Sequence, residues 1–356
     1  MLGALDDPNP FHYVVHDRLP YPLPEGHSKY IDDLSVWMSG EGAAAAMNFS
    51  VVLPNHLLAG TVNSEPALVV LARAAEAAGF AGVCVTDHPC PTGRWLDRGG
   101  HTAPDPFTAL GFIAGATSRV LLHTSILVMP YRNPFITARA GSSLDVFSGG
   151  RLILGVGVGY LKGEYKALGA DFDRRNELTD EYLTALTAAW TEDEFAFEGT
   201  GYSARGNRIL PRPIQQPHPP IWVGGNSRRA IRRAVRYGDA WCPFHLPAES
   251  PVAQTARTAA MGGSDALRSG IAYLRECVDE LGRERPIRIA LDSFTSAPDA
   301  DTFDALAGLS ELGVSWVTVH VSGSTVSQWC DGAQRFAEDI IAHFRREAGA
   351  VSGRET

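Results

Sequence analysis

Residues 219–243 read PPIWVGGNSRRAIRRAVRYGDAWCP, and this stretch contains a complete strand–helix–strand unit. Pro220–Val223 and Ala240–Pro243 are short apolar runs of the kind that form buried strands. Between them a helix is expected over Ser227–Tyr237, with its arginines facing outward from the apolar stripe. Parallel strands need such a helical connection, so this stretch predicts an α/β protein.

The same alternation of short strands and longer helices continues along the chain from Met47. Strands are expected at 49–54, 82–86, 120–127, 152–156, 220–223, 240–243, 287–291 and 316–321. Helices are expected at 64–78 with Ser64 as N-cap, then at 105–117, 133–150, 176–190, 227–237, 265–281, 301–312 and 328–346. Repeated strand–helix units of this number favour a closed (β/α)8 TIM barrel over an open, doubly wound sheet. Two insertions are expected, a small hairpin at 195–202 after the fourth helix and a polar loop at 249–264 after the sixth strand.

Residues 1–46 differ from the rest because they hold several prolines and no sustained hydrophobic period. Two interpretations stay open: an N-terminal extension that drapes over the barrel or is disordered, and translation that starts at Met47. A basic start followed by an apolar stretch is not seen, so no secretory signal is expected. The predicted units are therefore the extension at 1–46, the barrel at 47–347 and a frayed tail at 348–356.

The composition argues against several classes of function. The 356 residues carry 31 Lys and Arg against 40 Asp and Glu, and this net charge of −9 disfavours binding to nucleic acid. The 5 cysteines are scattered without a C-x-x-C pair, as in proteins with reduced thiols. Apolar runs fall short of the ~18 residues that a membrane span needs. We therefore expect a cytoplasmic protein that acts on a small molecule, without a nucleic-acid or membrane partner.

In a (β/α)8 barrel the active site lies at the carboxyl ends of the strands. The second strand ends at Thr86-Asp87-His88, where the histidine can give or take a proton near neutral pH and Asp87 can orient it. The alternative for His88 is a structural cap. The third strand ends with Thr124 and Ser125, whose hydroxyls either face a ligand or bond to the neighbouring strand. From the residues alone, bonding to the neighbouring strand is favoured.

Glycines mark the ends of two later strands. The fourth strand runs into Gly155-Val-Gly-Val-Gly-Tyr160, which lets a flat ligand or another backbone approach closely and does not match the Rossmann fingerprint. The fifth strand ends in Gly224-Gly-Asn-Ser227 at the start of a helix, where unpaired N–H groups favour a phosphate. A bound anion would also stabilise Arg228 and Arg229 in the first turn, although a solvated face is the default for them.

Histidines follow other strands too, at His56, His245 and His320. A barrel metallohydrolase needs several converging ligands, normally an H-x-H pair on one strand and a carboxylate on the last. The corresponding strands show neither feature, so we predict no metal site.

Four stretches of the chain resemble one known family in order and in spacing. They are Thr86–His88, Leu122–Pro134, Ser148–Gly159 and Pro219–Asn226. Together they resemble the luciferase-like monooxygenase superfamily, and most closely its group of coenzyme F420-dependent oxidoreductases. The resemblance covers about Met47 to Pro243 and implies a barrel of the bacterial luciferase-like type that holds an isoalloxazine or deazaflavin ring across its strand ends.

The resemblance also implies roles for individual residues. His88 is expected to be catalytic and to face the reactive part of the ring, and a non-proline cis peptide is expected at Ser125–Ile126, behind the ring. The residues expected to bind the cofactor are Asp87, Thr124, Ser125, Ile126, Gly157, Val158, Gly159, Tyr160, Gly224, Gly225, Asn226 and Ser227. Relatives commonly pair, so a homodimer is expected.

The leading functional hypothesis is hydride transfer between coenzyme F420 and an unidentified small organic substrate. The close alternative is an FMN-dependent monooxygenase on the same barrel. Two weaker alternatives are a metal-dependent barrel hydrolase and a cofactor-binding protein without turnover. Sugar-phosphate dehydrogenases of the superfamily carry Glu and Trp where this chain has Tyr160 and Thr92, with Trp95 three residues later. A less polar substrate than a sugar phosphate is therefore expected.

Overall fold

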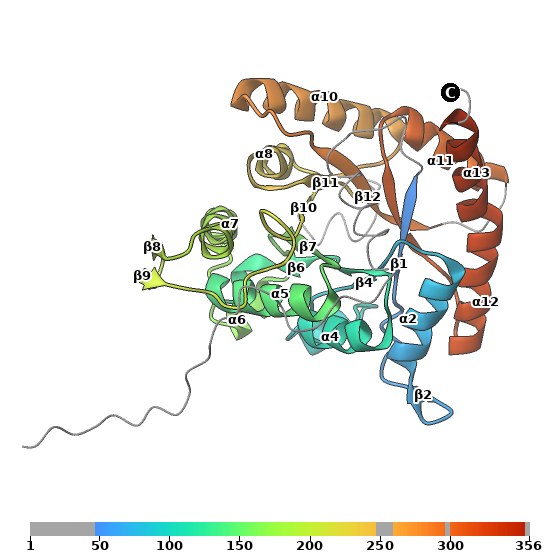
Figure 1. The fold of residues 1–356 in the computed structure, drawn as a ribbon, viewed down its shortest axis with the longest axis horizontal. Coiled ribbons are helices and arrows are strands. Elements are labelled where there is room, and N and C mark those ends of the chain that lie inside the picture. Colours follow the sequence, from blue (N-terminus) through green and yellow to red (C-terminus); the bar gives the residue numbers. More distant parts are fainter. Residues whose placement is uncertain (1–46, 247–258, 296–299, 353–356) are drawn as a thin grey trace, which may run out of the picture.

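The computed structural model describes residues 47–246, 259–295 and 300–352, and these residues form a closed barrel (Figure 1). The strands of its wall, all parallel, are β1 (Asn48–Val52), β4 (Gly82–Val85), β5 (Leu121–Thr124), β7 (Leu152–Gly157), β10 (Ile221–Gly224), β11 (Ala240–Cys242), β12 (Arg288–Thr295) and β13 (Trp316–His320). The last strand pairs with the first, with Trp316 opposite Asn48, so the sheet closes on itself. The predicted (β/α)8 barrel is confirmed.

A layer of helices covers the outside of this wall (Figure 1). It is built from α2 (Ala67–Ala78), α4 (Pro106–Ala116), α5 (Pro134–Ser148), α7 (Arg175–Thr191), α8 (Arg228–Tyr237), α10 (Ser264–Leu281), α11 (Ala300–Glu311) and α12 (Val326–Phe336). A π-helical turn (Ala337–Ile341) joins α12 to α13 (Ala342–Ser352), which extends past the predicted barrel end at 347. Several helices begin at a side-chain cap, among them α5 at Asn133 and α8 at Ser227.

Two predicted boundaries are wrong. The sequence predicts that Ser64 caps the first helix, but Ser64 has a φ of 69° in the turn between β2 (Thr61–Val62) and β3 (Glu65–Pro66), and the helix begins at Ala67. This left-handed conformation suits a tight turn rather than an N-cap. The predicted strand 120–127 is interrupted as well, since β5 ends at Thr124 and β6 (Leu127–Val128) pairs with β7 separately.

Short elements follow several strands. They are α3 (Gly93–Leu96), the 3-10 turn η1 (Met129–Tyr131) and α6 (Lys162–Ala167). A hairpin of β8 (Phe195–Gly199) and β9 (Tyr202–Asn207) follows the helix α7. The hairpin predicted at 195–202 is thus confirmed, with a longer second strand. The predictions for residues 1–46 and for most of the loop 249–264 lie outside the described residues. Within the described parts of the chain, the helices are too short or too polar to cross a membrane.

Large side chains fill the amino-terminal half of the barrel interior. The rings of Trp222 and Trp316 meet edge to face, 5.1 Å apart, and the ring of His123 lies 4.7 Å from that of Trp222. Burial lowers the pKa of His123 to about 3, so its imidazole is neutral at physiological pH. This packed floor leaves the carboxyl ends of the strands as the open end of the barrel.

Arg151 ties two helices to the barrel wall. Its buried guanidinium donates hydrogen bonds to the carbonyl oxygens of Ala114, Val120 and Ser148, at 2.9, 3.1 and 2.7 Å. The last carbonyls of a helix have no partner within the helix itself. Arg151 supplies that partner for the end of α4, and burial lowers the pKa of its guanidinium without neutralising it.

Replacing Arg151 with Met should lower the free energy of unfolding by about 2–4 kcal/mol, because several buried carbonyls would lose their donors. Urea denaturation measures this change. Arg139→Met is the matched control, since Arg139 is exposed on α5, and we expect it to stay within about 0.5 kcal/mol of the wild type. Equal losses in the two variants would contradict the assignment.

Candidate active site

The site forms where the loops after β4 and β7 meet. His88 follows β4, and Glu164 lies in the first turn of α6, the short helix after β7. Nδ1 of His88 is 3.2 Å from Oε2 of Glu164, and the two side chains are 10% and 1% exposed. The pair therefore lies at the carboxyl ends of the strands, where barrel enzymes place their chemistry.

Two further donors hold the carboxylate of Glu164. The hydroxyl of Tyr131 donates to Oε2 at 3.0 Å, and the backbone N–H of Cys90 donates to Oε1 at 3.2 Å. Burial and the neighbouring carboxylate raise the pKa of Tyr131, so its hydroxyl stays protonated. In the tautomer that carries its proton on Nδ1, His88 donates a hydrogen bond to Oε2 of Glu164. Nε2 of His88 is then the nitrogen available for other chemistry.

Aromatic rings surround His88. The ring centres of Trp95, His101 and Tyr160 lie 4.9, 4.8 and 6.1 Å from its own. Burial, together with the nearby His88, lowers the pKa of His101 to about 4, so His101 is neutral at pH 7. Trp95 and Tyr160 also border an adjoining pocket of about 280 Å³, with Phe172 on its wall. The surface beside His88 is therefore largely aromatic.

Asp87 does not orient His88, contrary to the expectation. Its carboxylate is buried and pairs with both terminal nitrogens of Arg132, at 2.6 and 2.9 Å. It also accepts the backbone N–H of Val128 at 3.0 Å. Consecutive residues of an extended chain point to opposite sides, which separates the Asp87 side chain from that of His88. Asp87 thus anchors the segment that follows the cis peptide. The carboxylate that contacts His88 is that of Glu164.

The cis peptide expected at Ser125–Ile126 is present, and Ile126 lies just after the carboxyl end of β5. Within Val120–Pro130 it alone is half-buried, while the other residues are buried. A Cβ added to Gly157 would lie 2.0 Å from Cδ1 of Ile126, and one added to Gly224 would lie 3.2 Å from it. These two glycines therefore make room for Ile126, and the Ile126 side chain offers the surface that a flat ring could contact.

The hydroxyls beside Ile126 are bonded within the barrel. Thr124 Oγ1 donates to the carbonyl of Gly155 on the neighbouring strand at 2.7 Å, and Ser125 Oγ donates to Asp292 Oδ2 at 2.9 Å. Bonding to the neighbouring strand, the alternative favoured from the residues alone, is what the structure shows for Thr124.

The end of β7 is closely packed as well. Gly159 has a φ of 64°, and a Cβ on it would lie 2.6 Å from Cγ1 of Val128. The hydroxyl of Tyr165 donates to the carbonyl of Val158. Close packing of the barrel therefore explains these glycines directly. The expected contacts of Val158, Gly159 and Tyr160 with a cofactor stay predictions.

The loop after β10 retains the features of a phosphate site. Gly225 has a φ of 126°, and Ser227 Oγ accepts the N–H of Ala230 at 3.1 Å as the N-cap of α8. The buried side chain of Asn226 is fully used, since it donates to the carbonyl of Phe244 at 2.9 Å and accepts its N–H at 3.0 Å. Asn226 therefore fixes the loop, and backbone N–H groups at the helix start would be the phosphate ligands.

The arginines of α8 already have partners. The guanidinium of Arg228 lies 4.6 Å from the ring centre of Tyr273, and Arg229 pairs with a glutamate of α7. Arg233 is only 4% exposed and pairs with Asp180. The prediction that all these arginines face outward is therefore wrong for Arg233, because α8 packs against α7 through this ion pair.

The arrangement fits a cofactor with a phosphate and a flat ring. The N-terminus of α8 suits the phosphate, Gly224 brings that loop against Ile126, and the half-exposed Ile126 suits the ring. Among the described residues, His, Cys, Asp and Glu side chains do not gather in threes as metal ligands would.

Sequence reasoning missed Glu164 and Tyr131. Glu164 stands between Lys162 and Lys166 in a short polar stretch, which gives no sign that its carboxylate is buried. Tyr131 follows Pro130 in a stretch noted only for its family resemblance. The signal that could have pointed to Glu164 as a site residue is a charged side chain soon after the end of an apolar strand.

Comparison with known proteins identifies the family. The luciferase-like monooxygenase model matches residues 47–297. An FMNH2-dependent dimethylsulfone monooxygenase from Pseudomonas putida is 35% identical over 130 residues, which cover 36% of this chain and 36% of that enzyme. An F420-dependent glucose-6-phosphate dehydrogenase from Microbacterium testaceum is 33% identical over 171 residues, which cover 47% of this chain and 49% of that enzyme. The chain thus spans half or less of the length of these two relatives.

Solved structures agree on the fold. The monooxygenase RslO1 from Streptomyces bottropensis superposes with a TM-score of 0.63 over 84% of this chain and 100% of that chain, at 20% identity. The family model covers more than half of the present chain, and relatives of the chain include both FMNH2- and F420-dependent enzymes. The chain therefore belongs to the luciferase-like monooxygenase family.

Proposed function

We propose that the chain is an oxidoreductase that transfers a hydride between coenzyme F420 and a small organic substrate at the barrel mouth. The observation that carries this proposal is the buried Glu164–His88 pair, 3.2 Å apart, at the strand ends that also hold Ile126 and the phosphate loop. A proton donor or acceptor, a surface for a ring and a site for a phosphate are the parts that such chemistry requires.

The choice of F420 rests on two observations. The four sequence stretches that carry the family resemblance are most similar to the F420-dependent group, and the F420-dependent relative aligns with 47% of the chain, against 36% for the FMNH2-dependent one. FMN is the second candidate, which the 35% identity of the dimethylsulfone monooxygenase favours. Both cofactors carry a phosphate and a flat tricyclic ring, so the same loop and the same Ile126 surface suit either.

The cofactor, when bound, would supply or accept the hydride. The backbone N–H groups of Asn226 and Ser227 would bind its phosphate, aided by the positive end of the α8 dipole, while the N–H of Gly225 donates to the carbonyl of Cys242 at 3.1 Å. Ile126 would support one face of its ring. His88 would give a proton to the substrate, or take one from it, at Nε2.

Glu164 would prepare His88 for this role. Its buried negative charge, 3.2 Å from Nδ1, stabilises the imidazolium that forms when Nε2 takes up a proton. The same contact holds the ring in one orientation. Tyr131 and the N–H of Cys90 hold the carboxylate in place in turn. Tyr131, Glu164 and His88 thus form a chain, and Nε2 of His88 at its end would exchange the proton.

The walls beside His88 favour a substrate of low polarity. Trp95 and Tyr160 contribute aromatic surface, and Phe172 closes the adjoining pocket of about 280 Å³. Aromatic walls bind apolar and planar groups through area and stacking. This agrees with the departure of Thr92 and Tyr160 from the residues of the sugar-phosphate dehydrogenases.

Titration of the purified full-length protein with F420 and with FMN, followed by fluorescence, should show saturable binding of F420 and binding of FMN that is about tenfold weaker or less. His88→Ala should bind F420 with nearly unchanged affinity, because the phosphate loop and Ile126 are intact, yet lose turnover in a substrate screen. His56→Ala is the control, since His56 is exposed. Tight FMN binding without F420 binding would reverse the cofactor assignment, and binding of neither would refute the proposal.

Replacing Glu164 with Gln should reduce turnover by about tenfold or more while cofactor affinity changes little, because the amide carries no negative charge and can present its NH2 group as well as its oxygen to Nδ1 of His88. Nitrogen-15 NMR of the imidazole reports this independently of activity: we expect Nδ1–H in the wild type and a mixture of tautomers in the variant.

Tyr131→Phe is the matched control for this experiment. It removes one hydrogen bond to the same carboxylate oxygen but keeps the negative charge, so His88 should retain the Nδ1–H tautomer. An Nε2–H tautomer in the wild type, or the same spectrum in Glu164→Gln, would contradict the assigned role of Glu164.

A further inference from the structure

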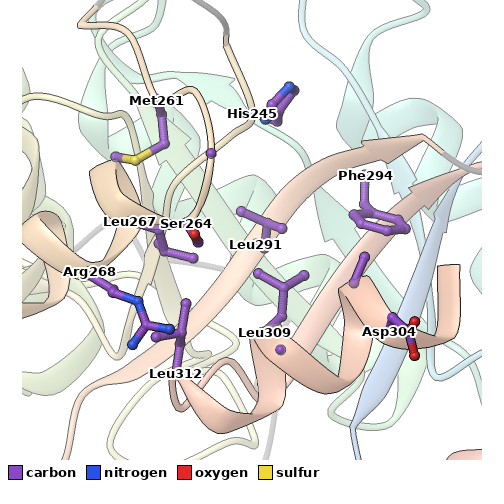
Figure 2. Close-up of a pocket in the computed structure, with 13 residues that line it drawn as sticks. His245, Met261, Ser264, Leu267, Arg268, Leu291, Phe294, Asp304, Leu309 and Leu312 are labelled. Atoms are coloured by element: carbon purple, nitrogen blue, oxygen red, sulfur yellow. The ribbon is translucent and has the colours of Figure 1, made fainter. Parts of the chain in front are cut away.

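A second cavity lies outside the barrel wall, between α10 and α11. Its volume is about 520 Å³, and side chains of α10, β12 and α11 line it (Figure 2). Binding pockets for small ligands commonly measure about 300–1,000 Å³, so the cavity is large enough for a molecule of that size.

The strand β12 separates this cavity from the site at the barrel mouth. Alternate residues of a strand face opposite sides of the sheet. Asp292 faces the barrel interior, where it accepts a hydrogen bond from Ser125, and Ala290 belongs to the packed floor. Leu291, between them, lines the cavity on the outer side. A ligand of the cavity would therefore be distinct from the cofactor and from its substrate.

The cavity interrupts the layer of helices. In other parts of the layer helices pack directly on one another, as α2 does on α4, α5 on α7 and α8 on α10. Side chains of α10 and α11 instead line a common cavity. Leu306 anchors α11 to the barrel and is fully buried, whereas Leu309, one turn later, lines the cavity and is only half-buried.

The walls of the cavity are mostly apolar. Their apolar side chains are Met261, Leu267, Leu291, Phe294, Leu309 and Leu312. Leaving such a surface in water costs free energy in proportion to its area. An apolar group that fills the cavity would recover that free energy.

Two charged side chains stand at opposite ends of the cavity, with leucines between them (Figure 2). They are Arg268 on α10 and Asp304 on α11, and neither has an ion pair or hydrogen bond within the part of the chain that the structure describes. Ser264 lies one turn before Arg268 on the same helix and also lines the cavity. Hydrogen-bond donors thus gather at one end, and a negative charge at the other end would repel an anion.

We propose that this cavity binds an elongated apolar carboxylate of the fatty-acid class. Its carboxylate would pair with Arg268, with the Ser264 hydroxyl as a second donor. Its hydrocarbon chain would lie along the leucines of α10, β12 and α11. The charge of Asp304 at the far end sets the direction of the ligand, since the opposite orientation would place two carboxylates together.

Isothermal titration calorimetry of the full-length protein with decanoate and with 1-decanol tests both parts of the ligand. We expect one site per chain, with decanol binding about tenfold more weakly than decanoate. Arg268→Ala should reduce decanoate to the affinity of decanol. Arg275→Ala is the matched control, because Arg275 is exposed two turns later on α10 and does not line the cavity.

Gly308 allows the cavity to be filled without disturbing the fold. It lies on the cavity wall in α11, and a Cβ added there would meet no atom within 4 Å. Gly308→Trp should therefore abolish decanoate binding, whereas Gly308→Ala should keep it.

Three results would overturn the proposal. Decanoate binding that survives Gly308→Trp, or that added F420 or FMN displaces, would place the ligand at the barrel mouth. Absence of decanoate binding to the wild type would refute the site outright. If decanoate does not bind and sedimentation shows a wild-type dimer that Gly308→Trp dissociates, a second copy of the chain covers this face.

Discussion

The side chain of Ile126 is the constraint on which the shape of the barrel mouth depends. A Cβ at Gly157 would collide with it at 2.0 Å, and one at Gly224 would make a tight contact at 3.2 Å, so two strands carry glycine beside it. The residues before Ile126 are bonded to the same wall, Thr124 to β7 and Ser125 to β12. One half-exposed residue, fixed against three strands, therefore provides the surface on which a flat ring can lie.

Burial decides which side chains at the barrel mouth carry a charge. Tyr131 is held protonated and His101 neutral at pH 7, so the buried carboxylate of Glu164 acts on His88 without a competing cation from either. The strand β12 then separates two environments. Its inner face holds Asp292 beneath the mouth, while its outer face turns Leu291 toward a cavity with apolar walls. The same strand thus borders the barrel mouth on one side and a cavity with apolar walls on the other.

The sequence predicts the barrel well because buried parallel strands and capped helices leave local signals, such as the apolar run before Gly224 and the cap at Ser227. The end of the second strand located His88, and the family resemblance located the cis peptide. The partners of Asp87 and Asn226 and the burial of Glu164 were not predictable, because they depend on which loops meet in space. The prediction that Ser64 caps the first helix was wrong because serine is as common in tight turns as at helix caps.

A crystal structure of the protein with bound F420 is the most direct test of the central claim, that the mouth holds a redox cofactor between Ile126 and His88. We expect the deazaflavin ring against the Ile126 side chain, its phosphate at the backbone N–H groups of Asn226 and Ser227, and Nε2 of His88 facing the reactive side of the ring. A ring bound away from Ile126, or a phosphate bound elsewhere than at the start of α8, would contradict it.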